Sequence, residues 1–179
     1  MIAKAIDRLE SLDGYLKEYH YQPELTRKLD HVEDKAFTQE LVNEIVLWKV
    51  NRYAGLPKQT LASIDSLTSI APGDHRQAKD VILALLDTRD VDLAMASTLL
   101  RFRNPHAFQI IDRHAYRAVY GESLKLYTQT ANARKIDVYF GYLDKLRELA
   151  SLAGVAFEDL DRMLYQFDKR LNGTLDAGD

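Results

Sequence analysis

The sequence of 179 residues contains no cysteine. This absence excludes disulfide bonds, thiolate metal sites, iron–sulfur clusters and cysteine nucleophiles, and it is consistent with a reducing compartment. No segment approaches the roughly 18 consecutive apolar residues of a transmembrane helix. The first residues are amphipathic but lack the uninterrupted apolar core of a signal peptide. We therefore expect a cytoplasmic protein with no membrane partner.

Motifs for small ligands are also missing. The sequence has no glycine-rich phosphate loop, so the common nucleotide-binding motifs are excluded. The histidines show no paired spacing on one helix, and we expect neither a metal site nor a cofactor. They are His20, His31, His75, His106 and His114. Because the net charge is −3, nucleic acid would have to bind to a local basic face.

Helical periodicity is present along nearly the whole chain, and no alternating strand pattern persists. The composition, 46% hydrophobic and 28% charged, is typical of a soluble globular protein. We expect an all-α fold without a sheet, built from about eight or nine short helices in one compact domain over residues 1–179. The tail after residue 173 is expected to fray. The oligomeric state is left open.

Capping residues mark the helix boundaries. Thr38, Asp74, Asp92 and Asp112 each precede an apolar-periodic segment and predict a helix start. Glycines predict the corresponding ends, at Gly121, Gly154 and Gly173. The later helices are expected at about 93–103, from 113 to Gly121, 133–152 and 158–171.

The last of these helices carries many charged residues. They are Asp159, Asp161, Arg162, Asp168, Lys169 and Arg170. Charges of both signs at helical spacing are typical of a solvated helix face with ion pairs along the helix. We therefore expect these side chains to be exposed.

The segment from Asp90 to Gly121 carries the strongest functional signal. An apolar helix ends at Asn104-Pro105, a short loop follows, and Asp112 opens a second helix. Four arginines make this segment basic: Arg101, Arg103, Arg113 and Arg117. A basic patch at a helix start suits a phosphate, although a solvated face is the more common reason for such a patch. Asp112 is accordingly either a structural cap, the more common role, or a catalytic group.

This segment resembles the signature of helix–hairpin–helix DNA glycosylases. The family's hairpin reads roughly Leu-Pro-Gly-Val-Gly, and lyase members have a lysine two positions after it. Downstream comes Val-Asp-Thr-His and then an arginine. Without gaps, the hairpin falls on residues 88–92, the lysine on Ala94 and the aspartate on Asp112, and His114 and Arg117 match the later positions.

The resemblance covers residues 88–117 and implies a divergent glycosylase core. In that case Asp112 is the catalytic carboxylate, which stabilises the positive charge that develops on the sugar or activates water. The resemblance also implies DNA as partner, and basic residues near Asp112 would bind it. They are Arg101, Arg103, Arg113, His114 and Arg117.

The same resemblance implies a pocket in which aromatic side chains stack on a flipped base. The candidates are Trp48, Tyr53, Tyr116 and Tyr120. Their helical spacing is also typical of core packing, which is the more common role.

Other short segments resemble an uncharacterised bacterial family with the same core, for which no function is known. These segments are Trp48-Lys49, Ala96-Ser97 and Leu160-Asp161-Arg162.

The sequence departs from the glycosylase pattern at the hairpin. Asp90 and Asp92 occupy the glycine positions, and two carboxylates would repel a phosphate unless a metal ion lay between them. Ala94 has no amine to form a Schiff base with the sugar, so no lyase activity is implied. The missing cysteines exclude the branch that carries an iron–sulfur cluster.

Three hypotheses therefore stand. The first is a monofunctional DNA glycosylase that hydrolyses the N-glycosidic bond. The second is a non-catalytic nucleic-acid-binding module. The third is a helical protein that binds a partner or a small ligand, in which Asp112 is only a helix cap.

Overall fold

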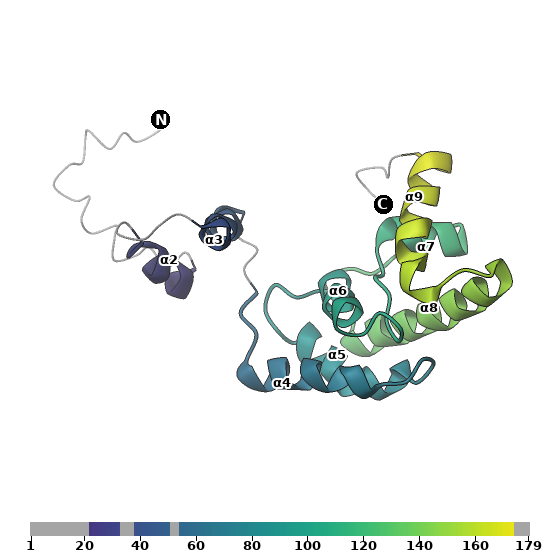
Figure 1. Cartoon of the computed structure of the whole chain (residues 1–179), viewed down its shortest axis with the longest axis horizontal. Coiled ribbons are helices and arrows are strands. Elements are labelled where there is room, and N and C mark those ends of the chain that lie inside the picture. The colour runs from purple at the N-terminus through teal and green to yellow at the C-terminus, as the bar shows by residue number, and fades with distance from the viewer. Residues whose placement is uncertain (1–21, 33–37, 51–53, 174–179) are drawn as a thin grey trace. The chain divides into compact units, whose positions relative to one another are not determined.

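The structure is a computed structural model that describes residues 22–32, 38–50 and 54–173. Every regular element in these ranges is a helix, as the periodicity predicts (Figure 1). The contacts divide the chain into two compact units, residues 1–53 and 54–179. None of the helices in the described ranges is both long and apolar enough to cross a lipid bilayer.

The first unit contains α2 (Pro23–Leu29) and α3 (Gln39–Lys49). Thr38 caps α3 as predicted, because its hydroxyl accepts the backbone N–H of Leu41 at 3.3 Å. The two helices are joined by a hydrogen bond of 2.8 Å from Trp48 Nε1 to Thr26 Oγ1. Trp48 is thus half-buried within this unit and uses its polar atom there.

The described part of the second unit, residues 54–173, consists of α4 to α9 and three short 3₁₀ turns. In chain order they are α4 (Lys58–Ser66), η2 (Leu67–Ser69), η3 (His75–Ala78), α5 (Lys79–Leu86), α6 (Leu93–Arg103), α7 (Arg113–Tyr120), α8 (Asn132–Ala153), η4 (Phe157–Asp159) and α9 (Leu160–Leu171). The long helix α8 packs against both α5 and α7, and α7 makes its most extensive contacts with α9 (Figure 1).

The core of the second unit is built from apolar side chains of α5, α6 and α8 and of the loop between α6 and α7. Those that are completely inaccessible include Ile82, Leu85, Leu100, Phe108, Ile111, Tyr139 and Leu143. Burying one such side chain contributes about 1.5–3 kcal/mol. The loop therefore belongs to the core and is held in place, which fixes the position of Asp112 directly after it.

Most of the predicted helix ends are confirmed. Asp92 and Asp112 cap α6 and α7 through their side chains. Gly121 and Gly154 end α7 and α8 in the left-handed conformation, with φ of 70° and 66°, which suits glycine. The prediction for Asp74 is wrong: its side chain caps no helix, and a 3₁₀ turn precedes α5.

Candidate functional site

Asp112 lies at the first turn of α7, where its backbone is extended and its side chain turns back onto the helix. Its Oδ1 accepts the backbone N–H of Ala115 at 2.7 Å. Burial raises the pKa of this carboxyl above its ordinary value of 3.8, and the hydrogen bond from Ala115 and the nearby His114 oppose this shift. Asp112 is thus a helix cap and also a half-buried carboxyl with a raised pKa.

The carboxyl of Asp112 lies on a cavity of about 200 Å³. The start of α6, the start of α7, the loop before α8 and the first turn of α8 all contribute to its wall. Its lining residues include two aspartates, an arginine, a lysine, a tyrosine and an alanine. They are Asp92, Ala94, Asp112, Arg113, Tyr127 and Lys135. The cavity therefore brings together two carboxylates and two cations around an apolar floor that includes Ile111 and Leu124.

Two helix N-termini open onto this cavity, because residues at the first turns of both α6 and α7 line it. At the α6 end, Asp92 Oδ1 accepts the backbone N–H of Ala94 at 2.8 Å. Each N-terminus is thus occupied by its own aspartate, which satisfies one amide and offsets part of the helix dipole. Ala94 and Asp112 lie on the same cavity although they are far apart along the chain.

The hairpin between α5 and α6 is closed by a hydrogen bond of 3.2 Å from the N–H of Val91 to the carbonyl of Thr88. Asp90 lies in this turn with φ of 63°, in the left-handed region that favours glycine. An aspartate in this conformation costs about 1 kcal/mol. Its carboxylate is half-exposed and lies 3.4 Å from Arg89 Nε.

Side chains of α6 and α8 hold the loop between α6 and α7 by binding its backbone groups. Tyr139 and Tyr142 of α8 donate to the carbonyls of Gln109 and Ile110, at 2.9 and 3.0 Å. Ser97 of α6 accepts the N–H of Ile111 at 3.2 Å. These bonds fix the backbone up to the residue before Asp112. Nothing in the local sequence links these tyrosines or Ser97 to this loop.

Asn104 fixes the beginning of the same loop. Its side-chain amide is buried and donates to the carbonyls of Leu67 and Ile70, at 2.8 and 2.9 Å. Its Oδ1 accepts the N–H of Ala107 at 3.2 Å. One side chain thus joins the loop to the turn that follows α4.

Replacing Asn104 with alanine is expected to lower the free energy of unfolding by about 2–4 kcal/mol, because buried carbonyls and an amide lose their partner. Urea denaturation followed by circular dichroism measures this loss. Asn132→Ala is the matched control, since the Asn132 amide binds Asp87 in an exposed pair. A cost below about 1 kcal/mol is expected for the control. Equal losses in the two variants would contradict the role assigned to Asn104.

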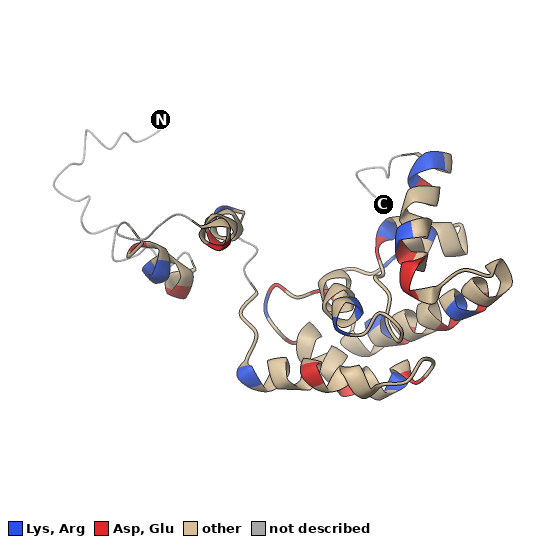
Figure 2. Ribbon diagram, viewed as in Figure 1, with Lys and Arg blue, Asp and Glu red and all other residues tan. Residues whose placement is uncertain are grey.

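His114 and Arg117 both bind Asp168 of α9, which is fully buried. His114 Nδ1 lies 2.6 Å from Asp168 Oδ2, and Arg117 donates from Nε and Nη2 to the two carboxylate oxygens at 2.9 Å. Asn172 adds a further hydrogen bond to Asp168 at 2.8 Å. Figure 2 shows that α7 and α9, which pack against each other, carry both basic and acidic residues. These two predicted DNA-binding residues thus join two helices.

The prediction of a solvated face on α9 is wrong for two of its residues. Asp161 and Asp168 are buried, with 4% and 0% of their surface exposed. The Arg117 guanidinium beside Asp168 holds the pKa of that carboxyl far below its ordinary range. Asp161 accepts the N–H of Ile110 at 3.3 Å and lies 3.7 Å from Arg101 Nε. Both carboxylates are therefore part of the packing that supports the loop and α7.

The remaining predicted DNA-binding residues differ in their surroundings. Arg101 is buried, and its Nη2 donates to the carbonyl of Glu158 at 2.9 Å. Arg103 binds both the carbonyl and the carboxylate of Asp65, at 3.1 and 3.3 Å. Arg113 is exposed and lies on the cavity next to Asp112. The structure thus brings only Arg113 of this group together with Asp112 on the cavity.

The predicted pocket aromatics are also separated. Tyr116 and Tyr120 of α7 contact one another, with ring centroids 4.4 Å apart. Tyr116 lines a second cavity of about 200 Å³, whereas Tyr120 is partly exposed. Trp48 belongs to the first unit, and Tyr53 lies outside the described residues.

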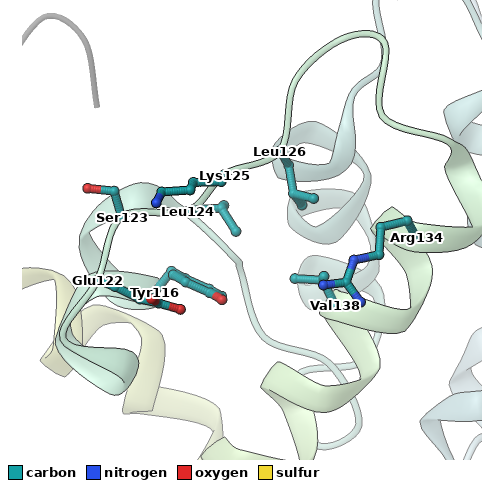
Figure 3. Close-up of a pocket in the computed structure, with 8 residues that line it drawn as sticks. All are labelled: Tyr116, Glu122, Ser123, Leu124, Lys125, Leu126, Arg134 and Val138. Carbon is teal, nitrogen blue, oxygen red and sulfur yellow. The ribbon is translucent and has the colours of Figure 1, made fainter.

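The second cavity lies between the end of α7, the loop after it and the first turns of α8. Figure 3 shows Tyr116 and Leu124 on one side and Arg134 and Val138 of α8 on the other. Leu124 and Leu126 line both cavities, so the loop that carries them forms a common wall.

Two residues of the Asp112 cavity, Tyr127 and Lys135, were not identified from the sequence.

Within the described ranges, no group of three histidines, aspartates or glutamates is arranged to hold a metal ion. Comparisons with family models, with curated proteins and with solved structures find no match for this chain.

Proposed function

We propose that this protein is a divergent DNA glycosylase that hydrolyses an N-glycosidic bond with Asp112 as the catalytic carboxylate and without lyase activity. One observation supports the proposal most directly. Asp112 and Ala94, which the resemblance aligns with the catalytic aspartate and the lyase lysine, line the same cavity. The left-handed backbone of Asp90, at a position where the family has glycine, adds support.

The chemistry follows from the surroundings of the carboxylate. As the bond between base and sugar breaks, positive charge develops on the sugar, and a nearby carboxylate stabilises this charge. Asp112 also serves as the base that takes a proton from the attacking water, because its raised pKa makes it a stronger base than an exposed aspartate. The side chain of Ala94 carries no amine, so hydrolysis takes the place of Schiff-base formation at this position.

The contacts to the DNA backbone differ from the pattern of the family. Asp90 and Asp92 occupy the glycine positions of the hairpin, where carboxylates oppose a phosphate. Arg113 is exposed next to Asp112 and provides the opposite charge on the same cavity. We therefore assign the phosphate contact to Arg113 and not to the hairpin.

The test is incubation of the protein with duplexes that each carry one damaged or mismatched base, followed by alkali, which breaks the strand at abasic sites. The proposal expects cleavage of at least one duplex by the parent protein and none by Asp112→Asn. Strand breakage that needs no alkali would contradict the absence of lyase activity. Binding without cleavage on a broad panel would favour the non-catalytic module, and neither binding nor cleavage would favour the partner-binding hypothesis.

A further inference from the structure

Lys135 lies in the first turn of α8 and lines the cavity that holds Asp112. Only 8% of its surface is exposed, so the stem of the side chain is packed inside the protein. Within the described ranges its ammonium makes no hydrogen bond and no ion pair within 4.0 Å. The charged side chains that share the cavity are Asp92, Asp112 and Arg113.

This placement is unfavourable for the protein alone. A lysine in the first turn of a helix lies near the positive end of the helix dipole, and an ammonium on a largely buried side chain keeps only part of its hydration. The aspartates on the cavity form no ion pair with it within 4.0 Å, and one oxygen of each accepts a backbone amide of its own helix. Such a cation would be stabilised by an anion that enters the cavity.

The distribution of charge suits a nucleotide. During excision the sugar gains positive charge, while the phosphates next to it remain negative. A carboxylate and an ammonium on the walls of one cavity match these two charges at the same time. Tyr127, which lines the cavity and is 66% exposed, adds an apolar surface for a sugar or a base.

We propose that Lys135 binds the phosphate that adjoins the sugar at Asp112. The proposal rests on the proposed function, because it takes DNA as the ligand. It adds a contact from α8 that lies outside the segment that resembles the glycosylases.

Binding to a duplex with a tetrahydrofuran abasic analogue tests this proposal without any need for catalysis. Fluorescence anisotropy at several salt concentrations gives both the affinity and its salt dependence. Lys135→Met is expected to weaken binding about tenfold, as for the loss of one charge-assisted hydrogen bond. It is also expected to reduce the slope of log K against log salt by about 0.9, the value for one phosphate contact.

Two variants serve as controls. Lys79→Met removes an exposed lysine of α5 that does not line the cavity, and it should leave affinity and slope unchanged. Lys135→Arg keeps the charge and should restore most of the binding. Thermal unfolding provides a further readout: Lys135→Met should have a Tm equal to or above that of the parent, because methionine keeps the buried stem without the charge.

Equal affinity and equal slope for the parent and Lys135→Met would overturn the proposal. So would a parent protein that does not bind the duplex. Binding that depends on Lys135, together with no excision on the panel of damaged duplexes, would support the phosphate contact and contradict the glycosylase activity. The two proposals can therefore fail separately.

Discussion

Under the proposed function, replacing Asp112 with asparagine is expected to lower the rate of base excision by about 10²–10⁴-fold while the protein stays folded. The rate falls because asparagine can neither stabilise the positive sugar as an anion nor accept a proton from water. The fold persists because asparagine caps helices about as well as aspartate, so the free energy of unfolding should change by less than about 1 kcal/mol. Single-turnover excision and urea denaturation measure the two effects.

Asp92→Asn is the matched control for this experiment. Asp92 also caps a helix and lies on the same cavity, so the substitution makes the same chemical change at another point of the cavity wall. We expect Asp92→Asn to excise at a rate within a few fold of the parent. Equal losses in the two variants would show that any charge on the cavity suffices and would contradict a specific catalytic role for Asp112.

The pH dependence of excision gives a second readout of Asp112. The carboxylate must be ionised to act, so the rate should fall as the pH drops through its pKa. Because burial raises that pKa above 3.8, the acid limb of the rate profile should lie above pH 3.8. An acid limb at or below pH 3.8 would assign the activity to another carboxyl.

Replacing Asp168 with alanine is expected to lower the free energy of unfolding by about 3–5 kcal/mol. The reason is that Arg117 would remain largely buried, with only 16% of its side chain exposed, and would lose the carboxylate that receives two of its hydrogen bonds. His114 would lose the same partner. Urea denaturation monitored by circular dichroism measures the loss of stability.

Glu148→Ala is the control for Asp168→Ala. The Lys145–Glu148 pair is exposed on α8, and removing such a pair costs at most about 1 kcal/mol. A loss below 1 kcal/mol for Asp168→Ala as well would mean that the buried pair contributes no more than a surface pair. The α7–α9 contact would then depend on its apolar side chains alone.

The sign of the pH effect for Asp168 follows from its lowered pKa. The carboxyl binds protons more weakly in the folded chain than in the unfolded chain. Its contribution to stability is therefore complete above the ordinary value of 3.8 and is lost as the pH falls below it. The stability difference between the parent and Asp168→Asn should shrink in the same range, as acid titrations of the two proteins can determine.

Features that depend on neighbours in the sequence could be predicted. The capping aspartates at 92 and 112 and the glycines at 121 and 154 follow from local hydrogen bonding and from backbone conformation. The position of Asp112 at a helix start was therefore predictable. The cavity beside it was not, since Tyr127 and Lys135 reach it from the loop before α8 and from α8 itself.

The burial of Asp161 and Asp168 was predicted wrongly for a related reason. Charge at helical spacing is usually exposed, and only a partner from elsewhere in the fold makes the burial of a carboxylate tolerable. A signal was nevertheless present. Asp161 and Asp168 are separated by two helical turns and lie on the same side as the buried Leu164. A carboxylate on the apolar side of a helix indicates that a group from elsewhere in the fold pairs with it.

The order in which the chain is synthesised determines when the contact between Asp168 and Arg117 can form. The two residues are 51 positions apart. At about 5–20 residues per second, the ribosome adds Asp168 several seconds after Arg117. Until α9 emerges, Arg117 lacks the hydrogen bonds to Asp168, although Asp112 and its cavity wall from α6 have already been made. The α7–α9 contact can therefore form only after α9 has been synthesised, and α7 reaches its final packing later than the helices that precede it.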